Sequence, residues 1–181
     1  GDYFAHVDTL AFSPDENILA ATGWDEEITL WDVPSRRRIG SLDGDIQVRS
    51  LSFAPDGLTL MAIRDGNLTA WDVAQRQEIP TVAAGEVFAL TFTPDGGALV
   101  TAGEDIILWD IPSGKKVATL DGHAERNTSL GVSPDGMVLA ADDRDYTVRL
   151  WDLDLVRRAG GAVGPDVPLL AELTQLRGHT Q

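Results

Sequence analysis

The chain has 181 residues, no cysteine and a formal net charge of −15 at pH 7. Its length suits one domain with a real core, and its charge disfavours nucleic acid and anionic membranes as partners, because their phosphates would be repelled. The lack of cysteine excludes a disulfide framework, a Cys-ligated metal and a thiol nucleophile, and it agrees with the cytoplasmic location that we expect.

The predicted elements begin with the apolar stretch VDTLAF at 7–12, whose aromatic and β-branched content favours a strand. SPDE at 13–16 suits a type I turn, because proline at the second position fixes φ. ILAATG at 18–23 is the second predicted strand and ITLWDV at 28–33 is the third. RRRIGSL at 36–42 is a fourth, more polar strand, so these residues predict a four-stranded antiparallel meander.

The same order of elements recurs along the chain. The Trp-Asp pair recurs at spacings of 40, 38 and 42 residues, and the prolines of the Pro-Asp turns recur at spacings of 41, 39 and 40. Sheets this small cannot bury both faces alone, so the units are expected to stack on one another. Further strands are predicted on this pattern at 87–92, 115–120, 137–142, 147–153 and 170–176.

A period of about 40 residues, four strands per unit and a Trp-Asp pair are typical of a propeller blade. The sequence resembles the WD40-repeat β-propeller family, with four divergent repeats over nearly the whole chain. The resemblance implies an all-β fold in which 1–181 is a single propeller segment. Its blades are expected at 1–42, 43–82, 83–120 and 121–176, with an inserted loop at 154–169 and the start of a further blade at 177–181.

The resemblance also implies a buried hydrogen-bond network in each blade, which joins a His, a Ser or Thr, an Asp in a turn and the Trp of the Trp-Asp pair. Several network positions lack the His or the hydroxyl, so these blades are expected to depend more on packing than on side-chain networks. The residues expected in structural roles are Trp31, Trp71, Trp109, Trp151, Asp25, Asp65, Asp105, Asp145, His123 and Thr101.

In WD40 relatives, partners dock on the face made by the turn between the second and third strands and by the loop that leads into each blade. Trp and Arg are enriched in binding hot spots, and Trp24 is the one tryptophan of five outside the repeat period. For each Arg, an ordinary solvated or ion-paired side chain is the alternative. The residues expected on this face are Trp24, Arg64, Glu104, Arg144, His6, Gln47, Glu86 and Arg126.

Catalytic motifs are not recognisable in the sequence. The three histidines, His6, His123 and His179, fall at blade starts and not at metal-ligand spacing. We therefore expect a scaffold that binds protein partners, with no enzyme activity, no metal and no cofactor. Two alternatives stay open: a regulatory propeller of a larger signalling enzyme, such as a kinase or NTPase, and a hydrolase or lyase propeller with carboxylates near its axis.

The number of repeats leaves the assembly open, because propellers have roughly 4 to 8 blades. The chain is expected to be a piece of a longer propeller, to pair with a copy of itself in a larger ring, or to close as a four-bladed ring. An open arc would expose the apolar faces of its terminal blades. Self-association into a homo-oligomer is therefore expected for the isolated piece.

Overall fold

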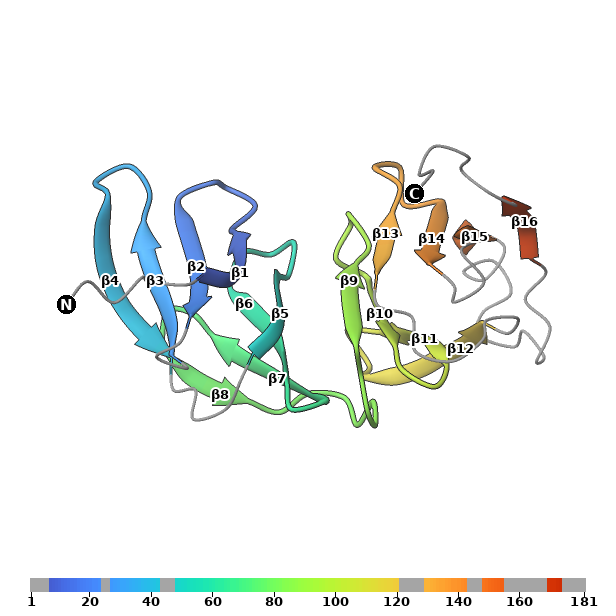
Figure 1. The fold of residues 1–181 in the computed structure, drawn as a ribbon, viewed down its shortest axis with the longest axis horizontal. Coiled ribbons are helices and arrows are strands. Elements are labelled where there is room, and N and C mark those ends of the chain that lie inside the picture. The colour runs from blue at the N-terminus through green and yellow to red at the C-terminus, as the bar shows by residue number, and fades with distance from the viewer. Residues whose placement is uncertain are drawn as a thin grey trace, which may run out of the picture. The chain divides into compact units, whose positions relative to one another are not determined.

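Four antiparallel four-stranded meanders make up the fold of the computed structural model, which describes residues 7–23, 27–42, 48–120, 129–142, 148–154 and, for the backbone only, 169–173. In each meander every strand pairs with the next one along the chain, as expected for a propeller blade (Figure 1). Within the described part of the chain, we find no helix with the length and apolarity to cross a membrane.

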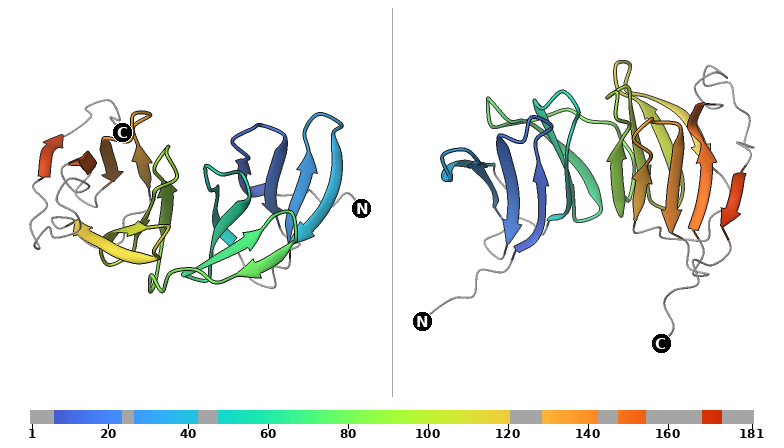
Figure 2. Two further views of the ribbon diagram at one scale, coloured as in Figure 1. Left: turned by 180° about the vertical axis from the view of Figure 1, so that it is seen from behind. Right: turned by 90° about the horizontal axis from the view of Figure 1, so that it is seen from above.

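The chain divides into two compact units, Gly1–Ala83 and Ala84–Gln181, and each contains two meanders (Figure 2). We refer to the meanders as the first to the fourth blade. The first has β1 (Val7–Phe12), β2 (Ile18–Gly23), β3 (Ile28–Asp32) and β4 (Arg37–Leu42). The second has β5 (Val48–Phe53), β6 (Thr59–Arg64), β7 (Asn67–Asp72) and β8 (Gln77–Ile79).

The second unit repeats this plan. Its third blade has β9 (Ala89–Phe92), β10 (Ala98–Ala102), β11 (Ile106–Asp110) and β12 (Lys115–Leu120). Its fourth blade has β13 (Leu130–Val132), β14 (Val138–Asp142), β15 (Val148–Asp152) and β16 (Leu169–Leu173). The predicted strands at 7–12, 18–23 and 115–120 match β1, β2 and β12 from end to end. Residues 155–168 of the predicted insertion, and the predicted blade start at 177–181, lie outside the described residues.

In three of the four blades, the hydroxyl before the Pro-Asp pair both accepts and donates a hydrogen bond within the turn. Ser13 Oγ accepts a hydrogen bond from the Ile18 amide at 2.8 Å and donates one to Asp15 Oδ1 at 2.6 Å. Thr93 and Ser133 make the same pair of bonds in the third and fourth blades. The Ser13 hydroxyl, with help from Asn17, lowers the pKa of Asp15 from its ordinary 3.8 to about 2.

The Asp of each Trp-Asp pair closes the next turn. Asp32 accepts a hydrogen bond from the Ser35 amide at 2.8 Å, Asp72 from Gln75 at 2.7 Å and Asp110 from Ser113 at 2.9 Å. Hydrogen bonds from Ser35 lower the pKa of Asp32, and those from Ser113 lower the pKa of Asp110. The repeat therefore places a carboxylate where it satisfies turn amides that no strand partner reaches.

The core of the first unit lies between its two blades. The first blade contributes a face of aliphatic side chains, including Ile28 and Leu30, which are 0% and 1% exposed. The second blade packs a row made of Phe53, Leu60 and Trp71 into the same cluster. Trp71 is 2% exposed, so its indole is sealed between two sheets.

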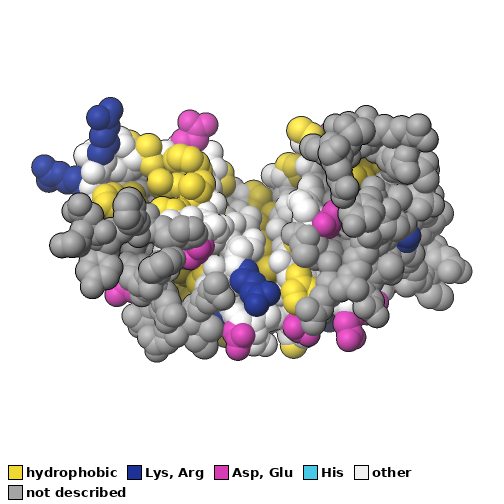
Figure 3. All heavy atoms as spheres, viewed as in Figure 1, with side chains coloured by type: hydrophobic (Ala, Val, Ile, Leu, Met, Phe, Trp, Pro, Cys, Tyr) yellow, Lys and Arg dark blue, Asp and Glu magenta, His cyan; other side chains and the backbone are white. Residues whose placement is uncertain are grey.

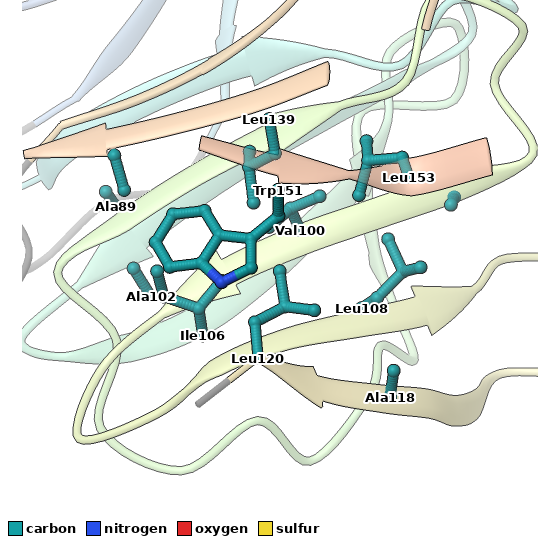
Figure 4. Close-up of a cluster of buried hydrophobic side chains, with 12 residues drawn as sticks. Ala89, Val100, Ala102, Ile106, Leu108, Ala118, Leu120, Leu139, Trp151 and Leu153 are labelled. Atoms are coloured by element: carbon teal, nitrogen blue, oxygen red, sulfur yellow. The ribbon is translucent and has the colours of Figure 1, made fainter. Parts of the chain in front are cut away.

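The core of the second unit has the same arrangement. Trp151 of the fourth blade is fully buried in a cluster with side chains of the third blade. Figure 4 shows its indole beside Ala102, Ile106 and Leu120. In both units, therefore, the Trp side of the later blade packs on the aliphatic side of the earlier one.

Trp31 corrects one prediction from the sequence. It was expected in the strand packing like the other three, but its side chain is 39% exposed. The reason is that it lies on the side of the first blade that faces away from the cluster with the second blade, whose members include Ala20, Ile28 and Leu30. Trp71 and Trp151, by contrast, are buried because the preceding blade of the same unit covers their side of the sheet.

A side chain also links the two blades of the first unit. Arg76, which has a positive φ of 56°, donates from Nη2 to the backbone carbonyl of Ile39. A Cβ at the neighbouring Gly40, whose φ is 153°, would lie 2.7 Å from Arg76 Cζ, so a side chain there would displace the guanidinium.

Replacing the two tryptophans of the first unit should separate their roles. Trp71→Ala is expected to cost about 3–5 kcal/mol of unfolding free energy, because it removes a buried indole and leaves a cavity. Trp31→Ala should cost clearly less, because much of that side chain already contacts water. Urea unfolding of both variants measures the difference, and equal losses would contradict it.

We expect Asp15 to become protonated at a lower pH than an ordinary aspartate. Its lowered pKa means that its charged form is favoured in the folded state, so its contribution to stability is fully present above the ordinary value of 3.8 and is lost as the pH falls towards about 2. NMR of the side-chain carboxyl carbon should give a midpoint near 2 in the wild type and a higher one in Ser13→Ala. Ser113→Ala is the control, since it should raise the pKa of Asp110 and leave Asp15 unchanged; an Asp15 midpoint at or above 3.8 in the wild type would refute the assignment.

Candidate partner-binding rim

The described residues of the predicted partner-binding face lie where the second and third strands of a blade meet, or where the chain leads into a first strand. The structure describes three of the eight, namely Arg64 in the first unit and Glu86 and Glu104 in the second. Outside the described residues lie Trp24, Arg144, Arg126, His6 and Gln47, together with the predicted structural residues Asp25, Asp145 and His123.

The hairpin beside Arg64 is set by its two turn residues. Asp65 and Gly66 have φ values of 47° and 77°, which is the left-handed pair that a two-residue hairpin requires. The turn carbonyl of Asp65 accepts a hydrogen bond from Asn67 Nδ2 at 3.2 Å. This hairpin therefore places Asp65 in the predicted turn and Arg64 at the last position of β6.

The Arg64 side chain contacts two residues of its own sheet, Trp71 and Glu78. Its guanidinium carbon lies 5.6 Å from the centre of the Trp71 ring, and Nη1 lies 3.6 Å from Glu78 Oε2. Its side chain is 16% exposed, and its Nε is buried without a hydrogen-bond partner. Arg64 thus covers Trp71 by a cation–π contact, and the structure offers only its outermost atoms to a partner.

In the third blade, the segments of the predicted rim residues Glu86 and Glu104 lie against each other because residue 103 is a glycine. The Phe88 amide donates to the Ala102 carbonyl at 2.7 Å, which extends the sheet towards the rim. A Cβ at Gly103 would lie 2.1 Å from the carbonyl oxygen of Glu86, a distance that no side chain tolerates. The segment of Glu86 and the hairpin of Glu104 are therefore packed backbone against backbone.

This packing gives the rim of the third blade an acidic character. Glu86, Glu104 and Asp105 are all exposed, while their neighbours Val87 and Ile106 are 1% and 0% exposed. The carboxylates are thus exposed to solvent, while the residues next to them in the chain are buried in the blade. Within the described ranges, no group of three or more His, Cys, Asp or Glu side chains is placed to hold a metal ion.

Thr101 and Trp109 show how the side-chain network survives in the third blade. Trp109 Nε1 donates to Thr101 Oγ1 at 2.9 Å, and both residues are buried, at 8% exposure for Trp109 and 1% for Thr101. By strand register, the equivalent of Thr101 is Ala21 in the first blade, Ala62 in the second and Ala141 in the fourth, so these blades cannot make this bond.

Two functional details were missed by the sequence reasoning. One is the hydroxyl before three of the four Pro-Asp pairs, whose signal was Ser13, Thr93 and Ser133 at equivalent positions, with Ala54 in the second repeat. The other is the contact of Arg76 with the Ile39–Gly40 backbone, for which a single sequence carries no signal.

Comparisons with known proteins identify a repeat family that matches this chain. The family described as "WD domain, G-beta repeat" matches residues 2–32 and 114–152. Periodic tryptophan protein 2 of Arabidopsis thaliana is 32% identical over 84% of this chain and 18% of its own length. Protein groucho of Drosophila melanogaster is 32% identical over 73% of this chain and 20% of its length.

Two further comparisons cover more of the matched protein. Small ribosomal subunit protein RACK1 of Caenorhabditis elegans is 26% identical over 82% of this chain and 51% of its own length. Among solved structures, Kuenenia stuttgartiensis hydrazine synthase has a TM-score of 0.76 over 96% of this chain and 51% of that chain, at 19% identity, which concerns the fold alone.

The chain spans about half or less of the length of these relatives, from 18% to 51%. Its four meanders, its repeated Trp-Asp turns and the matched repeat family agree with one another. The chain is therefore a WD40-repeat protein, built of β-propeller blades.

Proposed function

We propose that this chain is a non-catalytic protein-interaction scaffold that acts in the cytoplasm. The observation that carries the proposal is the rim of the third blade, where Glu86 and Glu104 are exposed on a rigid base and no described contact of the fold uses their side chains. The repeated Asp and Trp residues, in contrast, are occupied in turns and in packing.

The names of two relatives support a role in assemblies. RACK1 is named as a small ribosomal subunit protein, and an Arabidopsis relative that is 28% identical over 84% of this chain is named as a cofactor of the APC complex. Both names describe components of larger complexes. The hydrazine synthase likeness supports no activity for this chain, because it is a likeness of fold.

The charge of the rim defines the partner chemistry that we propose. Neighbouring carboxylates on a chain with a net charge of −15 attract Lys and Arg side chains and speed their encounter. The proposed partner is therefore a protein with a basic surface or segment. A second copy of this chain is another partner that we propose, through a different surface.

Charge reversal at the rim should weaken partner binding. The double change Glu86→Lys and Glu104→Lys is expected to lower the amount of each specifically bound protein and to flatten the salt dependence of its binding. Affinity enrichment from a cell extract with quantitative mass spectrometry measures the first effect. Calorimetry with the purified partner at two salt concentrations measures the second.

The double change Gln75→Lys and Gln77→Lys supplies the control, because it also introduces two lysines, at exposed positions beyond the end of β7 that lies opposite the β6–β7 hairpin. It should bind like the wild type. Equal binding by the rim variant and the wild type would remove the rim from the proposal, and failure to enrich any protein would contradict a scaffold function.

Gly103→Ala tests the base of the rim. The added Cβ would collide with the Glu86 carbonyl, so the two segments must separate, at an expected cost of about 1–3 kcal/mol for overpacking. Gly131→Ala is the control, because nothing lies within 4 Å of a Cβ there. Thermal unfolding compares the two variants, and equal melting temperatures would mean that the rim is not held by this contact.

A further inference from the structure

One side of the first blade carries an exposed row of apolar side chains, which we call the Trp31 face. Phe12, Leu19 and Trp31 pair across β1, β2 and β3, and Leu10 lies two residues before Phe12 on the same side. Leu10 is 55%, Phe12 54% and Trp31 39% exposed. Figure 3 shows hydrophobic side chains gathered on the surface of the N-terminal unit, at the upper left of the view.

The equivalent row of the second blade is buried. Phe53, Leu60 and Trp71 pair across β5, β6 and β7 in the same register, and they are 7%, 0% and 2% exposed. What covers them is the aliphatic side of the first blade, which includes Ile28 and Leu30. The composition of the two rows is the same, residue for residue, so the Trp31 face has the chemistry of a blade-docking surface.

The fourth blade repeats the arrangement in the second unit. Val132, Leu139 and Trp151 pair in the same register, and the last two are fully buried in a cluster with Val100 and Leu108 of the third blade. A row of this type therefore lies under an aliphatic blade side in each unit. We therefore expect the Trp31 face to bind a surface of the same kind, namely the aliphatic side of a blade.

The aliphatic side that would fit the Trp31 face is present on the fourth blade. Ala140 pairs with Leu150 just as Ala20 pairs with Leu30, and Val148 occupies the position of Ile28. Ala20, Ile28 and Leu30 are at most 1% exposed, whereas Ala140, Val148 and Leu150 are only partly buried. Both halves of a blade–blade interface thus occur on one chain, one on each unit.

The turns predict the register of such an interface. In the first unit, a Cβ at Gly57 of the second blade would lie 3.7 Å from Cδ of Pro14 in the first blade. In the second unit, a Cβ at Gly136 would lie 3.5 Å from Cδ of Pro94. The fourth residue of one turn therefore meets the proline of the preceding blade's turn.

We propose that the Trp31 face binds the side of the fourth blade that carries Ala140, Val148 and Leu150, in a second copy of this chain. The contact is heterologous, so two copies can close through two such contacts or more copies can extend it. By the register of the two internal interfaces, Glu16 of one copy meets Pro134 of the other. This inference uses none of the rim residues, so it stands or falls separately from the proposed scaffold function.

Cross-linking of single-cysteine variants tests the register directly, because the chain has no cysteine of its own. A mixture of Glu16→Cys and Pro134→Cys treated with a short bismaleimide should give a covalent dimer that contains one of each. Each variant alone should give little. The exposed Ser113→Cys replaces Pro134→Cys in the control mixture and should give no dimer above background.

Light scattering after size-exclusion chromatography supplies the second measurement. The wild type should elute as a dimer or larger, and more so at high salt, because salt screens the repulsion between two acidic copies. Trp31→Glu should weaken the association about 30-fold or more, as expected for a hot-spot residue. Because Trp31 is partly exposed, this variant should keep the circular dichroism of the wild type.

Three outcomes would overturn the proposal. A wild type that is monomeric at all concentrations and salts would show that no second copy covers the face. Dimers of Glu16→Cys with itself would indicate that two Trp31 faces pack on each other. A cross-link within one chain of the double variant Glu16→Cys and Pro134→Cys, without dimers, would mean that the fourth blade of the same chain is the occupant.

Discussion

The packing of a Trp row against the aliphatic side of the preceding blade is the contact on which the structure depends. A four-stranded meander has two apolar sides and too few residues to bury either by itself. Trp71 and Trp151 show the result when the contact forms, since both are almost fully buried. Trp31 shows the result when it does not, since the same residue at the same repeat position remains 39% exposed.

The repeat period was enough to predict where most strands lie, because the signals that set it are local, although some ends differ, as for 87–92 against β9 (Ala89–Phe92) and 170–176 against β16 (Leu169–Leu173). Pro fixes the second residue of each turn, and the turn hydrogen bonds from the Glu16, Gly57, Gly96 and Gly136 amides follow. The alternation of apolar residues then assigns each side chain to a side of its sheet. The second-strand prediction at 18–23 agrees with β2 at both ends for these reasons.

The candidate rim was harder to predict, because side-chain environment depends on residues distant in the sequence or on a neighbouring sheet. Arg64 was expected to face partners, but Trp71 and Glu78 on the next two strands hold its guanidinium. Trp31 was expected to be buried, and whether it is depends on a blade that its own repeat does not contain. Glu86 and Glu104 were placed on one rim by spacing, whereas the closeness of their segments required Gly103.

Contacts specific to one pair of blades limit how far the repeats can be exchanged. The Arg76 guanidinium fits beside Gly40, and the third blade has Ala118 where the first has Gly40. In a chimera that moves the second blade behind the third, the Arg76 guanidinium would therefore have to move away from the Ala118 side chain, so redesign of this chain should move blades as adjacent pairs.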